Sequence, residues 1–276
     1  MSKETKKYND LISISRELRK RIIKTSYEAK IPHIGSCLSC IELLVFLYWK
    51  ELNIDPTNSE AINRDRFILS KGHGAPALFQ VLGLKGFFPI ERLNSFGKPG
   101  SVFHEHPPKP GHIPGIEAAT GSLGHGFPMS VGISLARRIN NLKYRTYSIL
   151  SDGECNEGSI WEGAMFAGAQ GLDDLTIFID FNKWQATGRS KEVLALDPLK
   201  EKWQSFGWDV YEIDGHNFNE IDKSIELAKA NRNKPSAIIA HTIKGKGVSF
   251  MEDNNNWHYK TPNEEEFNKA FEELKN

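Results

Sequence analysis

The second half of the chain alternates between short apolar segments and amphipathic segments of helical length. Four segments have the length and the β-branched and aromatic residues of buried strands: 144–151, 175–181, 208–214 and 236–243. Helices are predicted over 127–140, 157–170, about 198–206 and 219–231. Strands separated by single helices form right-handed crossovers within a parallel sheet. The predicted fold class is therefore α/β, with a doubly wound parallel sheet flanked by helices.

The first half of the chain adds helices, one short strand and a long loop. Its segments are an amphipathic helix over 8–30, a more apolar helix over 38–52, a strand over 66–70 and a helix from about Ala75. Residues 97–126 are rich in Gly, Pro and His, and a loop of that length in a compact domain is usually functional or disordered. Because no linker, repeat or low-complexity segment divides the chain, we predict a single domain over residues 1–276.

Charge, hydropathy and cysteine usage exclude several classes of protein. Lys+Arg and Asp+Glu both number 35, which argues against nucleic acid as the main partner. The longest apolar run, 43–49, is far shorter than the ~20 residues of a membrane span, and no signal peptide is recognised. We therefore expect no membrane contact and a cytoplasmic location. Cys37 and Cys40 are interpreted as two small residues at the start of an apolar helix, with a redox pair or half a zinc site as the alternative.

An acidic turn follows the strand over 144–151. It carries Asp152, Glu154 and Glu157, and Asn182 follows the next strand along the chain. In a parallel sheet, ligands bind beyond the carboxyl ends of the strands, so these side chains are expected at one edge. Asp152, Asn182 and a backbone carbonyl from the following loop would form an all-oxygen site of the kind that Mg²⁺ shares with phosphate.

The same turn offers groups for a phosphate. Gly153 would let the backbone approach it, and a helix beginning near Asn156 would present unpaired N–H groups. The alternative interpretation is structural: Asp152 caps the helix, and Asn182 lies in an ordinary turn.

Six sequence segments occur in the order typical of one enzyme family. They are KIPHIGSCLS, DRFILSKGHG, PGIEAATGSLGHG, SDGECNEG, DFNKWQ and TIKGKGVSFMEDNNNWH. The fourth and fifth resemble the signature of thiamine diphosphate enzymes, and together the six resemble the transketolase family over nearly the whole chain. The resemblance implies the thiamine-diphosphate-binding fold, in its diphosphate-binding module. It also implies Asp152, Asn182 and the carbonyl of Trp184 as Mg²⁺ ligands, although Ser151 stands where the family usually has glycine.

The resemblance assigns further residues to cofactor binding. Gly121 and Leu123 would pack against the cofactor, and Gly153 and Glu154 would lie in the diphosphate turn. Glu157 matches an acidic position that links cofactor sites across a subunit interface in the family. Its alternative role is that of a glutamate in the first turn of a helix, favoured by the helix dipole.

Four of the nine histidines match positions that line the substrate channel in transketolases. The resemblance implies that His33, His73, His106 and His258 bind substrate hydroxyls and move protons, with His258 also near the diphosphate. An imidazole pKa near 6.5 suits both tasks at neutral pH. His112 is the rival to His106 for the loop position.

Other histidine roles stay open on the sequence alone. A zinc site built from His104, His106 and His112 is one alternative, and solvated loop histidines are another. His125 stands where many relatives have glutamine. Pro32 and Cys37 depart from a Gly-rich stretch of the family, which affects the expected shape of that loop.

The resemblance implies an activity and a partner. The activity is transfer of a two-carbon ketol unit from a ketose donor to an aldose acceptor, with thiamine diphosphate and Mg²⁺. We expect the chain to be the N-terminal subunit of a split transketolase that acts on sugars or sugar phosphates. Its partner in an α₂β₂ assembly would be a C-terminal, pyrimidine-binding subunit. The helix over 38–52 and the aromatic stretch around Trp161 are candidates for interface or core.

Two further functions compete with this hypothesis. One is another thiamine diphosphate carboligase, such as a deoxyxylulose-phosphate-synthase-like or unusual-sugar synthase subunit. The other is a non-catalytic cofactor-binding or regulatory subunit. A nucleotide hydrolase is disfavoured because the phosphate-binding loop G-x-x-x-x-G-K-[ST] does not occur.

Overall fold

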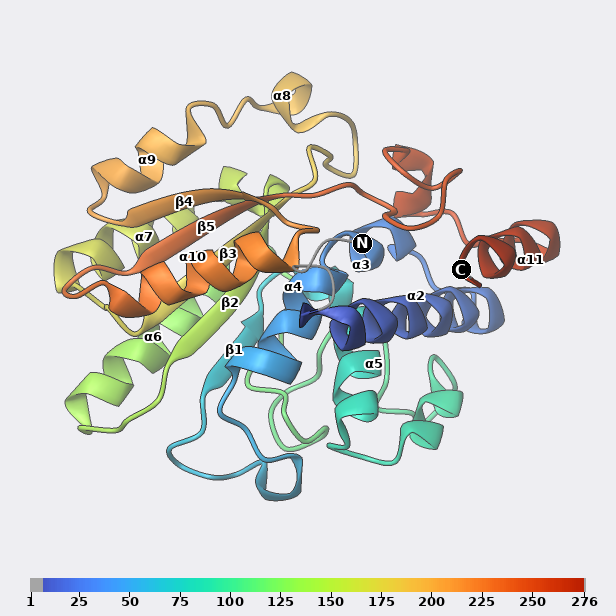
Figure 1. The fold of residues 1–276 in the computed structure, drawn as a ribbon, viewed down its shortest axis with the longest axis horizontal. Helices are drawn as coiled ribbons and strands as arrows, with labels where there is room; N and C mark the ends of the chain where they lie inside the picture. Colours follow the sequence, from blue (N-terminus) through green and yellow to red (C-terminus); the bar gives the residue numbers. More distant parts are fainter. Residues whose placement is uncertain (1–6, 276) are drawn as a thin grey trace.

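The computed structural model describes residues 7–275 and contains one parallel β-sheet (Figure 1). Its strands are β1 (Arg66–Leu69), β2 (Thr146–Ser151), β3 (Leu175–Phe181), β4 (Asp209–Asp214) and β5 (Ser236–His241). Their order across the sheet is β1-β2-β3-β5-β4, and every neighbouring pair is parallel. The predicted α/β class with a parallel sheet is confirmed.

Helices connect and cover the strands. The α-helices are α2 (Asn9–Ala29), α3 (Ile34–Ser39), α4 (Ile41–Phe46), α5 (Ala75–Lys85), α6 (Gly126–Ile139), α7 (Gly158–Gln170), α8 (Ser190–Val193), α9 (Leu199–Ser205), α10 (Phe218–Ala230) and α11 (Glu264–Glu273). The shorter elements are the π-helix η1 (Leu47–Glu51) and the 3₁₀-helices η2 (Pro56–Asn58), η3 (Gly72–Gly74), η4 (Ile90–Ser95), η5 (Gly153–Asn156) and η6 (Asn255–His258). Most predicted boundaries agree within two or three residues, which is the usual uncertainty at helix ends.

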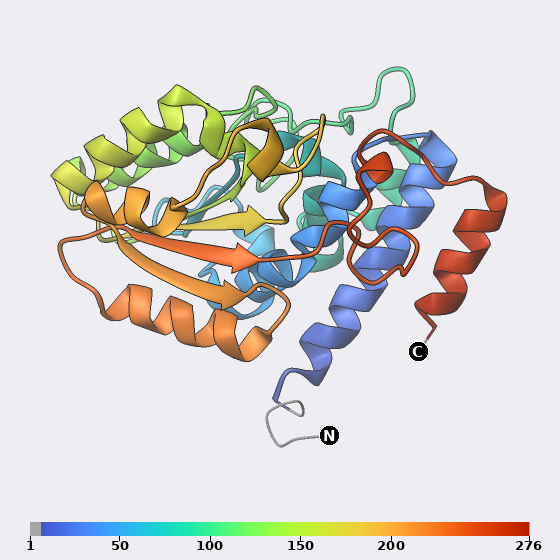
Figure 2. The same ribbon diagram turned by 90° about the horizontal axis from the view of Figure 1, so that it is seen from above.

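Two hydrophobic cores lie on opposite faces of the sheet. Ile149 and Phe178 pack with α2, α4, α5 and α10, whereas Leu150 and Ile177 pack with α6, α7 and α9. Successive strand residues point to opposite faces, so neighbouring residues of β2 and β3 enter different cores. Figure 2 shows α10 and α6 on opposite sides of the strands. The doubly wound arrangement is therefore confirmed.

The single helix predicted over 38–52 is wrong. The segment is divided into α3, α4 and η1, with a break at Cys40, where φ is −101° and ψ is 14°. Every residue of α3 and α4 is buried, so packing on all sides decides the backbone path and the sequence carries no amphipathic period to follow. Burial raises the pKa of the Cys37 and Cys40 thiols to about 12 and about 11, so these are packing residues and poor thiolate nucleophiles.

No helix within residues 7–275 combines the length and the apolar character needed to cross a lipid bilayer.

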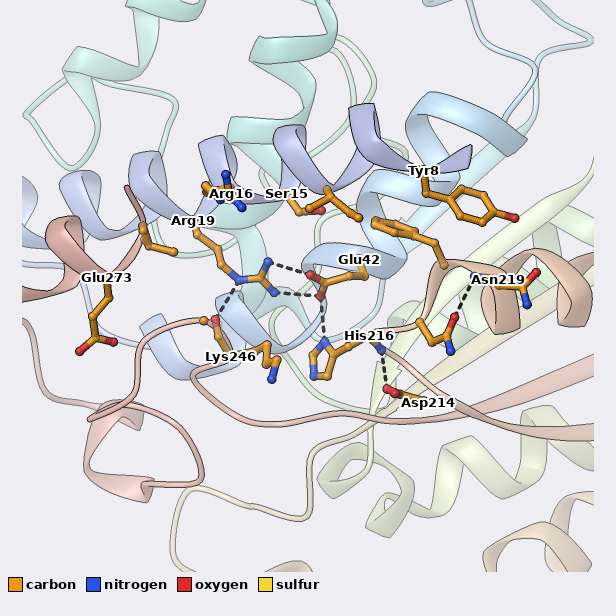
Figure 3. A pocket seen from close by; sticks show the side chains of 15 residues that line it. Tyr8, Ser15, Arg16, Arg19, Glu42, Asp214, His216, Asn219, Lys246 and Glu273 are labelled. Carbon is orange, nitrogen blue, oxygen red and sulfur yellow. Dashed lines mark hydrogen bonds and ion pairs between the residues drawn. The ribbon is translucent and has the colours of Figure 1, made fainter. Parts of the chain in front are cut away.

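A buried ion pair fastens α2 to α4. Arg19 Nη1 lies 2.7 Å from Glu42 Oε1, and Nη2 donates to Oε2 at 2.8 Å. His216 Nδ1 also contacts Oε2 at 2.8 Å (Figure 3). Its Nε2 accepts the N–H of Ile243 at 2.9 Å. Burial opposes ionisation of Glu42, but the charge of Arg19 and the contact with His216 outweigh it and lower the pKa to about 2. The network joins α2 and α4 to the segments that follow β4 and β5.

Replacing this carboxylate is predicted to destabilise the chain strongly. Glu42→Gln leaves the buried Arg19 charge uncompensated, which typically costs about 3–5 kcal/mol. Urea unfolding at pH 7 measures this loss. The control Glu28→Gln removes an exposed i,i+4 partner of Lys24 and should cost less than about 1 kcal/mol.

The same pair predicts acid sensitivity. The folded pKa of Glu42 lies below its ordinary value of 4.5, so its stabilising contribution is complete above pH 4.5 and is lost as the pH falls toward 2. The stability of the Gln variant should decline less over that interval. An equal decline in both proteins would contradict the assignment.

Candidate functional site

The carboxyl ends of β2 and β3 bring Asp152 and Asn182 to one edge of the sheet. Ser151 pairs with Asp180 across the two strands, and the Asp152 N–H donates to the Asp180 carbonyl at 3.3 Å. Asp152 is 0% exposed and Asn182 is 3% exposed. In Figure 2 the strand arrows point toward the side where the red segment after β5 lies. This edge is where a parallel sheet binds ligands.

One carboxylate oxygen of Asp152 is left without a partner. Oδ2 accepts a hydrogen bond from Ser190 Oγ at 2.7 Å, while Oδ1 is buried and unbonded. Burial raises the pKa of this carboxyl to about 6. The side chain makes no capping bond to η5, so the helix-cap alternative is not supported. A buried, unbonded carboxylate oxygen is a suitable ligand for a cation.

Asn182 fits both of its predicted roles, as a residue of a turn and as a metal ligand. Its Oδ1 accepts the Trp184 N–H at 3.1 Å, so the side chain does stabilise a turn. Lys183, at the centre of this turn, has a φ of 70°. An amide oxygen has two acceptor sites, so Oδ1 retains one for a metal ion.

The helix predicted to begin near Asn156 begins later. Residues Gly153–Asn156 form the 3₁₀-helix η5, and α7 starts at Gly158. Glu157 is therefore the N-cap residue of α7 and lies outside its first turn, and its exposed side chain makes no capping bond. The first-turn interpretation of Glu157 is wrong, and its carboxylate is accessible on this chain.

Glu154 is buried and holds the neighbouring loop in place. Its Oε1 accepts from Ser70 Oγ at 2.6 Å and from the Gly124 N–H at 2.9 Å. The Glu154 N–H in turn donates to Ser151 Oγ at 3.2 Å. Ser151 is thus accommodated by a hydrogen bond of its own. The contacts of Glu154 shape the loop that carries Gly121 and Leu123, so its effect on a cofactor would be indirect.

That loop passes so close to η3 that glycine is required on both sides. A Cβ at Gly72 would lie 2.4 Å from the Gly121 nitrogen. Gly121 has a φ of 149°, and a Cβ there would lie 2.6 Å from His106 Cδ2. The close approach brings the SKGHG segment, which contains His73, next to the loop that contains His106.

Four of the predicted site histidines form one cluster. The His33 ring centroid lies 5.5 Å from that of His73, 6.3 Å from that of His106 and 5.0 Å from that of His258. The exposed Tyr259 contacts the His258 ring at 4.7 Å. The structure therefore brings together the four histidines that the family resemblance selected.

The other histidines lie apart from this cluster. His112 is exposed and makes none of these ring contacts, so His106 is the loop histidine that the structure places with His33. His104 is bonded to the Ser101 carbonyl, and His125 is the exposed N-cap residue of α6. Across residues 7–275 there is no group of three His, Cys, Asp or Glu side chains that could hold a metal ion, which leaves the zinc alternative without support.

Burial keeps three of the four clustered histidines neutral. It lowers the pKa of His33 to about 4 and that of His258 to about 3, and it lowers the pKa of His73 well below 6.5. The positive charge of Lys71 depresses all three further. The expected pKa near 6.5 is therefore wrong for His33, His73 and His258 in the free chain. At neutral pH these three rings are uncharged, so each can accept a hydrogen bond at one nitrogen and donate one from the other.

Two buried lysines belong to the site and were missed from the sequence. Lys71 Nζ donates to the Ser36 carbonyl at 2.8 Å and pairs with the Asp180 carboxylate. Lys244 Nζ donates to Asn255 Oδ1 at 2.6 Å and lies 3.1 Å from His258 Nδ1, with no bonded carboxylate partner among residues 7–275. Burial, together with the charge of Lys71, lowers the pKa of Lys244 to about 7. Asp152 and Asp180 raise this pKa only in part, and a buried cation with no carboxylate bonded to it suits an anionic ligand.

Both lysines lie within glycine-containing motifs, Lys71 in SKGHG and Lys244 in TIKGKG. Lysines in glycine-rich loops usually extend into solvent, so composition offered no reason to expect their burial. Only the neighbouring segments of the folded chain enclose them.

A cavity of about 640 Å³ lies at a different place, beside α2 and the start of α10 (Figure 3). None of the predicted site residues lines it. Its central polar groups are the Arg19–Glu42–His216 network, whose atoms bond to one another and to backbone. This cavity is not the candidate site.

Comparison with known proteins identifies close relatives. Residues 9–274 match the family described as transketolase, thiamine diphosphate binding domain. The chain is 46% identical over 243 residues to the 6-deoxy-6-sulfo-D-fructose transketolase subunit SqwG of Clostridium sp. (strain MSTE9), covering 88% of both chains. It is 39% identical over 260 residues to one subunit of the apulose-4-phosphate transketolase of Phocaeicola vulgatus, covering 94% of this chain and 92% of the relative.

Solved structures agree in fold. The transketolase from Campylobacter jejuni superposes with a TM-score of 0.89 at 28% identity, covering 96% of this chain and 43% of that protein. The chain thus spans less than half the length of such single-chain transketolases, and it spans most of the length of the relatives named as subunits.

The buried carboxylate of Asp152, with its unbonded oxygen, is predicted to lower the stability of the ligand-free chain. Because the folded pKa of about 6 exceeds the ordinary value of 3.8, the ionised carboxylate destabilises the ligand-free chain above pH 6. Asp152→Asn should therefore raise the free energy of unfolding at pH 8 by about 2–3 kcal/mol. The gain should shrink as the pH approaches 4.

Chemical denaturation of the ligand-free chain at pH 8 and pH 4 measures the effect. Glu162→Gln, at an exposed position of α7, serves as the control and should change stability by less than about 0.5 kcal/mol. A less stable Asn variant at pH 8 would show that the carboxylate is compensated in the fold.

Proposed function

The chain belongs to the transketolase family, and from that premise we propose that it is the diphosphate-binding subunit of a two-chain transketolase. With thiamine diphosphate and Mg²⁺, the complex would transfer a two-carbon ketol unit from a ketose to an aldose. The observation that carries the proposal is the unbonded oxygen of Asp152 beside Asn182 at the carboxyl edge of the sheet. The match to relatives that are themselves named as subunits supports the two-chain form.

The residues present fit both the metal and the diphosphate. Asp152 Oδ1, Asn182 Oδ1 and the Trp184 carbonyl would hold Mg²⁺, which prefers oxygen ligands. Gly153 would give the diphosphate access to the backbone, and Lys244 would balance part of its charge. When bound, thiamine diphosphate supplies the carbanion chemistry of ketol transfer.

The histidine cluster is proposed to bind and deprotonate substrate. The neutral His33 and His73 rings can accept hydrogen bonds and protons from sugar hydroxyls, and His106 lies beside His33, where it can bind the same substrate. When Lys244 is protonated it can only donate to Nδ1 of His258, so a neutral His258 then carries its proton on Nε2 and can donate from there. The cluster therefore contains acceptors and one oriented donor.

A pyrimidine-binding partner subunit completes the proposal, in an α₂β₂ assembly in the cytoplasm. Glu157 is exposed at the start of α7, where it could reach a partner's cofactor site. Met165 and Phe166 of the same helix are 56% and 43% exposed, as expected of a surface that a partner covers. Trp161 is half-buried against Trp203 and belongs partly to the core.

The segment over 38–52 is a different case. Residues 38–48 are buried within this chain alone, so that part is core and the interface alternative does not apply to it.

The substrate is proposed to be a ketose outside the pentose phosphate set. Two relatives are named for 6-deoxy-6-sulfo-D-fructose and for apulose 4-phosphate, sugars with an anionic group at one end. An unusual-sugar transketolase is therefore the form of the activity that the relatives support best. A deoxyxylulose-phosphate-synthase-like reaction and a regulatory role are the competing outcomes.

The test is reconstitution with the partner subunit. The chain and a candidate pyrimidine-binding subunit, purified together, should transfer ketol units only when both chains, thiamine diphosphate and Mg²⁺ are present. Donors to compare are 6-deoxy-6-sulfo-D-fructose, apulose 4-phosphate, fructose 6-phosphate and xylulose 5-phosphate, each with a panel of aldehydes. Full activity of this chain alone would refute the two-chain proposal. Release of CO2 from pyruvate, supplied as a donor in place of the ketose, together with its condensation with an aldehyde would favour the synthase.

His73→Ala is predicted to lower kcat of the complex by about 10²–10⁴-fold, because a proton-transferring group is lost. Thiamine diphosphate affinity, measured by calorimetry, should change little. His104→Ala, on the exposed part of the loop, is the matched control and should leave kcat within about twofold of the unmodified complex. Unchanged activity of the His73 variant would favour the non-catalytic alternative.

A further inference from the structure

Asp253 joins two loops that carry different parts of the proposed site. One is the turn over 183–189, which contains Trp184, and the other is the segment over 251–258, which ends at His258. We infer that Asp253 is a positioning residue that couples the metal-binding turn to the substrate histidine. The inference rests on the proposed function, because it gives these two loops their roles.

Three donors converge on the Asp253 carboxylate. Oδ1 accepts from Trp184 Nε1 at 2.8 Å and from Arg189 Nη1 at 2.6 Å, and Oδ2 accepts from Arg189 Nη2 at 2.6 Å. The Arg189 guanidinium also lies 3.8 Å from the centre of the Trp184 ring. The bidentate pair, the indole donor and the cation–π contact fix one geometry, which a lone surface ion pair does not. We call these three residues the clasp.

The clasp closes the turn from outside. Trp184 and Arg189 form an isolated antiparallel bridge at its two ends, and the Gln185 N–H donates to the Gly188 carbonyl at 2.8 Å. On the inner side, the Trp184 N–H is held by Asn182 Oδ1. The proposed carbonyl ligand therefore belongs to a residue that is fixed at both its backbone N–H and its side chain.

The far end of the same turn reaches the other proposed ligand. Ser190 follows Arg189 directly, and its Oγ donates to Asp152 Oδ2 at 2.7 Å. This bond leaves Oδ1 of Asp152 as the oxygen available to a metal ion. Residues that orient metal ligands typically change metal affinity by about 10–100-fold when they are replaced. Within the clasp, Asp253 and Arg189 orient Trp184, and through the adjacent Ser190 the clasp also orients Asp152.

A second set of bonds continues from the turn to the histidine. Asn255 Nδ2 donates to the Ala186 carbonyl at 3.1 Å, and Asn255 Oδ1 accepts from Lys244 Nζ. Lys244 Nζ is also hydrogen-bonded to His258 Nδ1. The loop is held at Asp253 itself in a left-handed conformation, with φ of 54°, which is unfavourable for a non-glycine residue unless other contacts support it. The two loops thus form one bonded unit.

The clasp lies near the surface, with the Asp253 side chain 55% exposed and that of Arg189 29% exposed. Exposed ion pairs contribute little to global stability, so breaking the clasp should alter the site more than the fold. This separation makes the inference testable.

The first test measures Mg²⁺ dependence of the reconstituted complex at saturating thiamine diphosphate. Asp253→Asn keeps the shape and loses the charge, and Arg189→Lys keeps the charge and loses the bidentate fork. Each should raise the half-saturating Mg²⁺ concentration about tenfold, while kcat at saturating Mg²⁺ falls less than about threefold. The matched control Glu252→Gln removes the neighbouring carboxylate, which pairs with Lys246, and should leave both values unchanged.

The second test needs no activity. Hydrogen exchange on the full-length chain, without metal or cofactor, should show faster exchange in both 183–190 and 251–258 for Asp253→Asn. For Glu252→Gln the exchange of 183–190 should be unchanged. Exchange that rises only in 251–258, together with an unaltered Mg²⁺ requirement, would overturn the inference. A wild-type complex that needs no Mg²⁺ would instead refute the proposed function, and the exchange result would still decide whether Asp253 couples the loops.

Discussion

The buried ion pair between Lys71 and Asp180 is the contact on which the site depends. Lys71 follows β1 and Asp180 lies near the end of β3, and both side chains are completely buried. Asp180 also accepts hydrogen bonds from Ser39 of α3 and from Thr242 after β5. One carboxylate therefore joins four segments of the chain, and each of them leads into a residue of the site. Removing either charge would leave the other buried and unpaired, at a cost of several kcal/mol.

Around this pair the fold leaves two groups only partly compensated. Asp152 has a carboxylate oxygen without a donor, and Lys244 is a buried amine to which no carboxylate is bonded among residues 7–275, although Asp152 and Asp180 attract it. Both lower the stability of the ligand-free chain, because burial disfavours their charged forms. A cation bound by the first and an anion bound by the second would relieve both penalties. The destabilisation of the ligand-free chain and the proposed affinity for a metal diphosphate have the same physical origin.

Local sequence patterns were sufficient to predict two residues of the site. Asp152 and Asn182 each follow an apolar strand, and parallel pairing of β2 with β3 brings them together without further information. The histidines were not accessible in this way, since His33, His73 and His258 lie in three distant segments. Family resemblance selected them, and the folded chain brings their rings within 6 Å of one another. Their neutrality could not be foreseen, because it comes from burial and from Lys71.

Apolar periodicity over ten or fewer residues was enough to predict the fold class, the strand positions and the edge of the sheet where a site forms. Which polar groups are buried, paired or left without a partner became clear only in the folded chain. The break at Cys40, the enclosure of Lys244 and the contact of Asp253 with Arg189 all depend on neighbours from remote parts of the chain. Such contacts leave no periodic trace in the sequence, since each is set by the packing of elements that are separated along the chain.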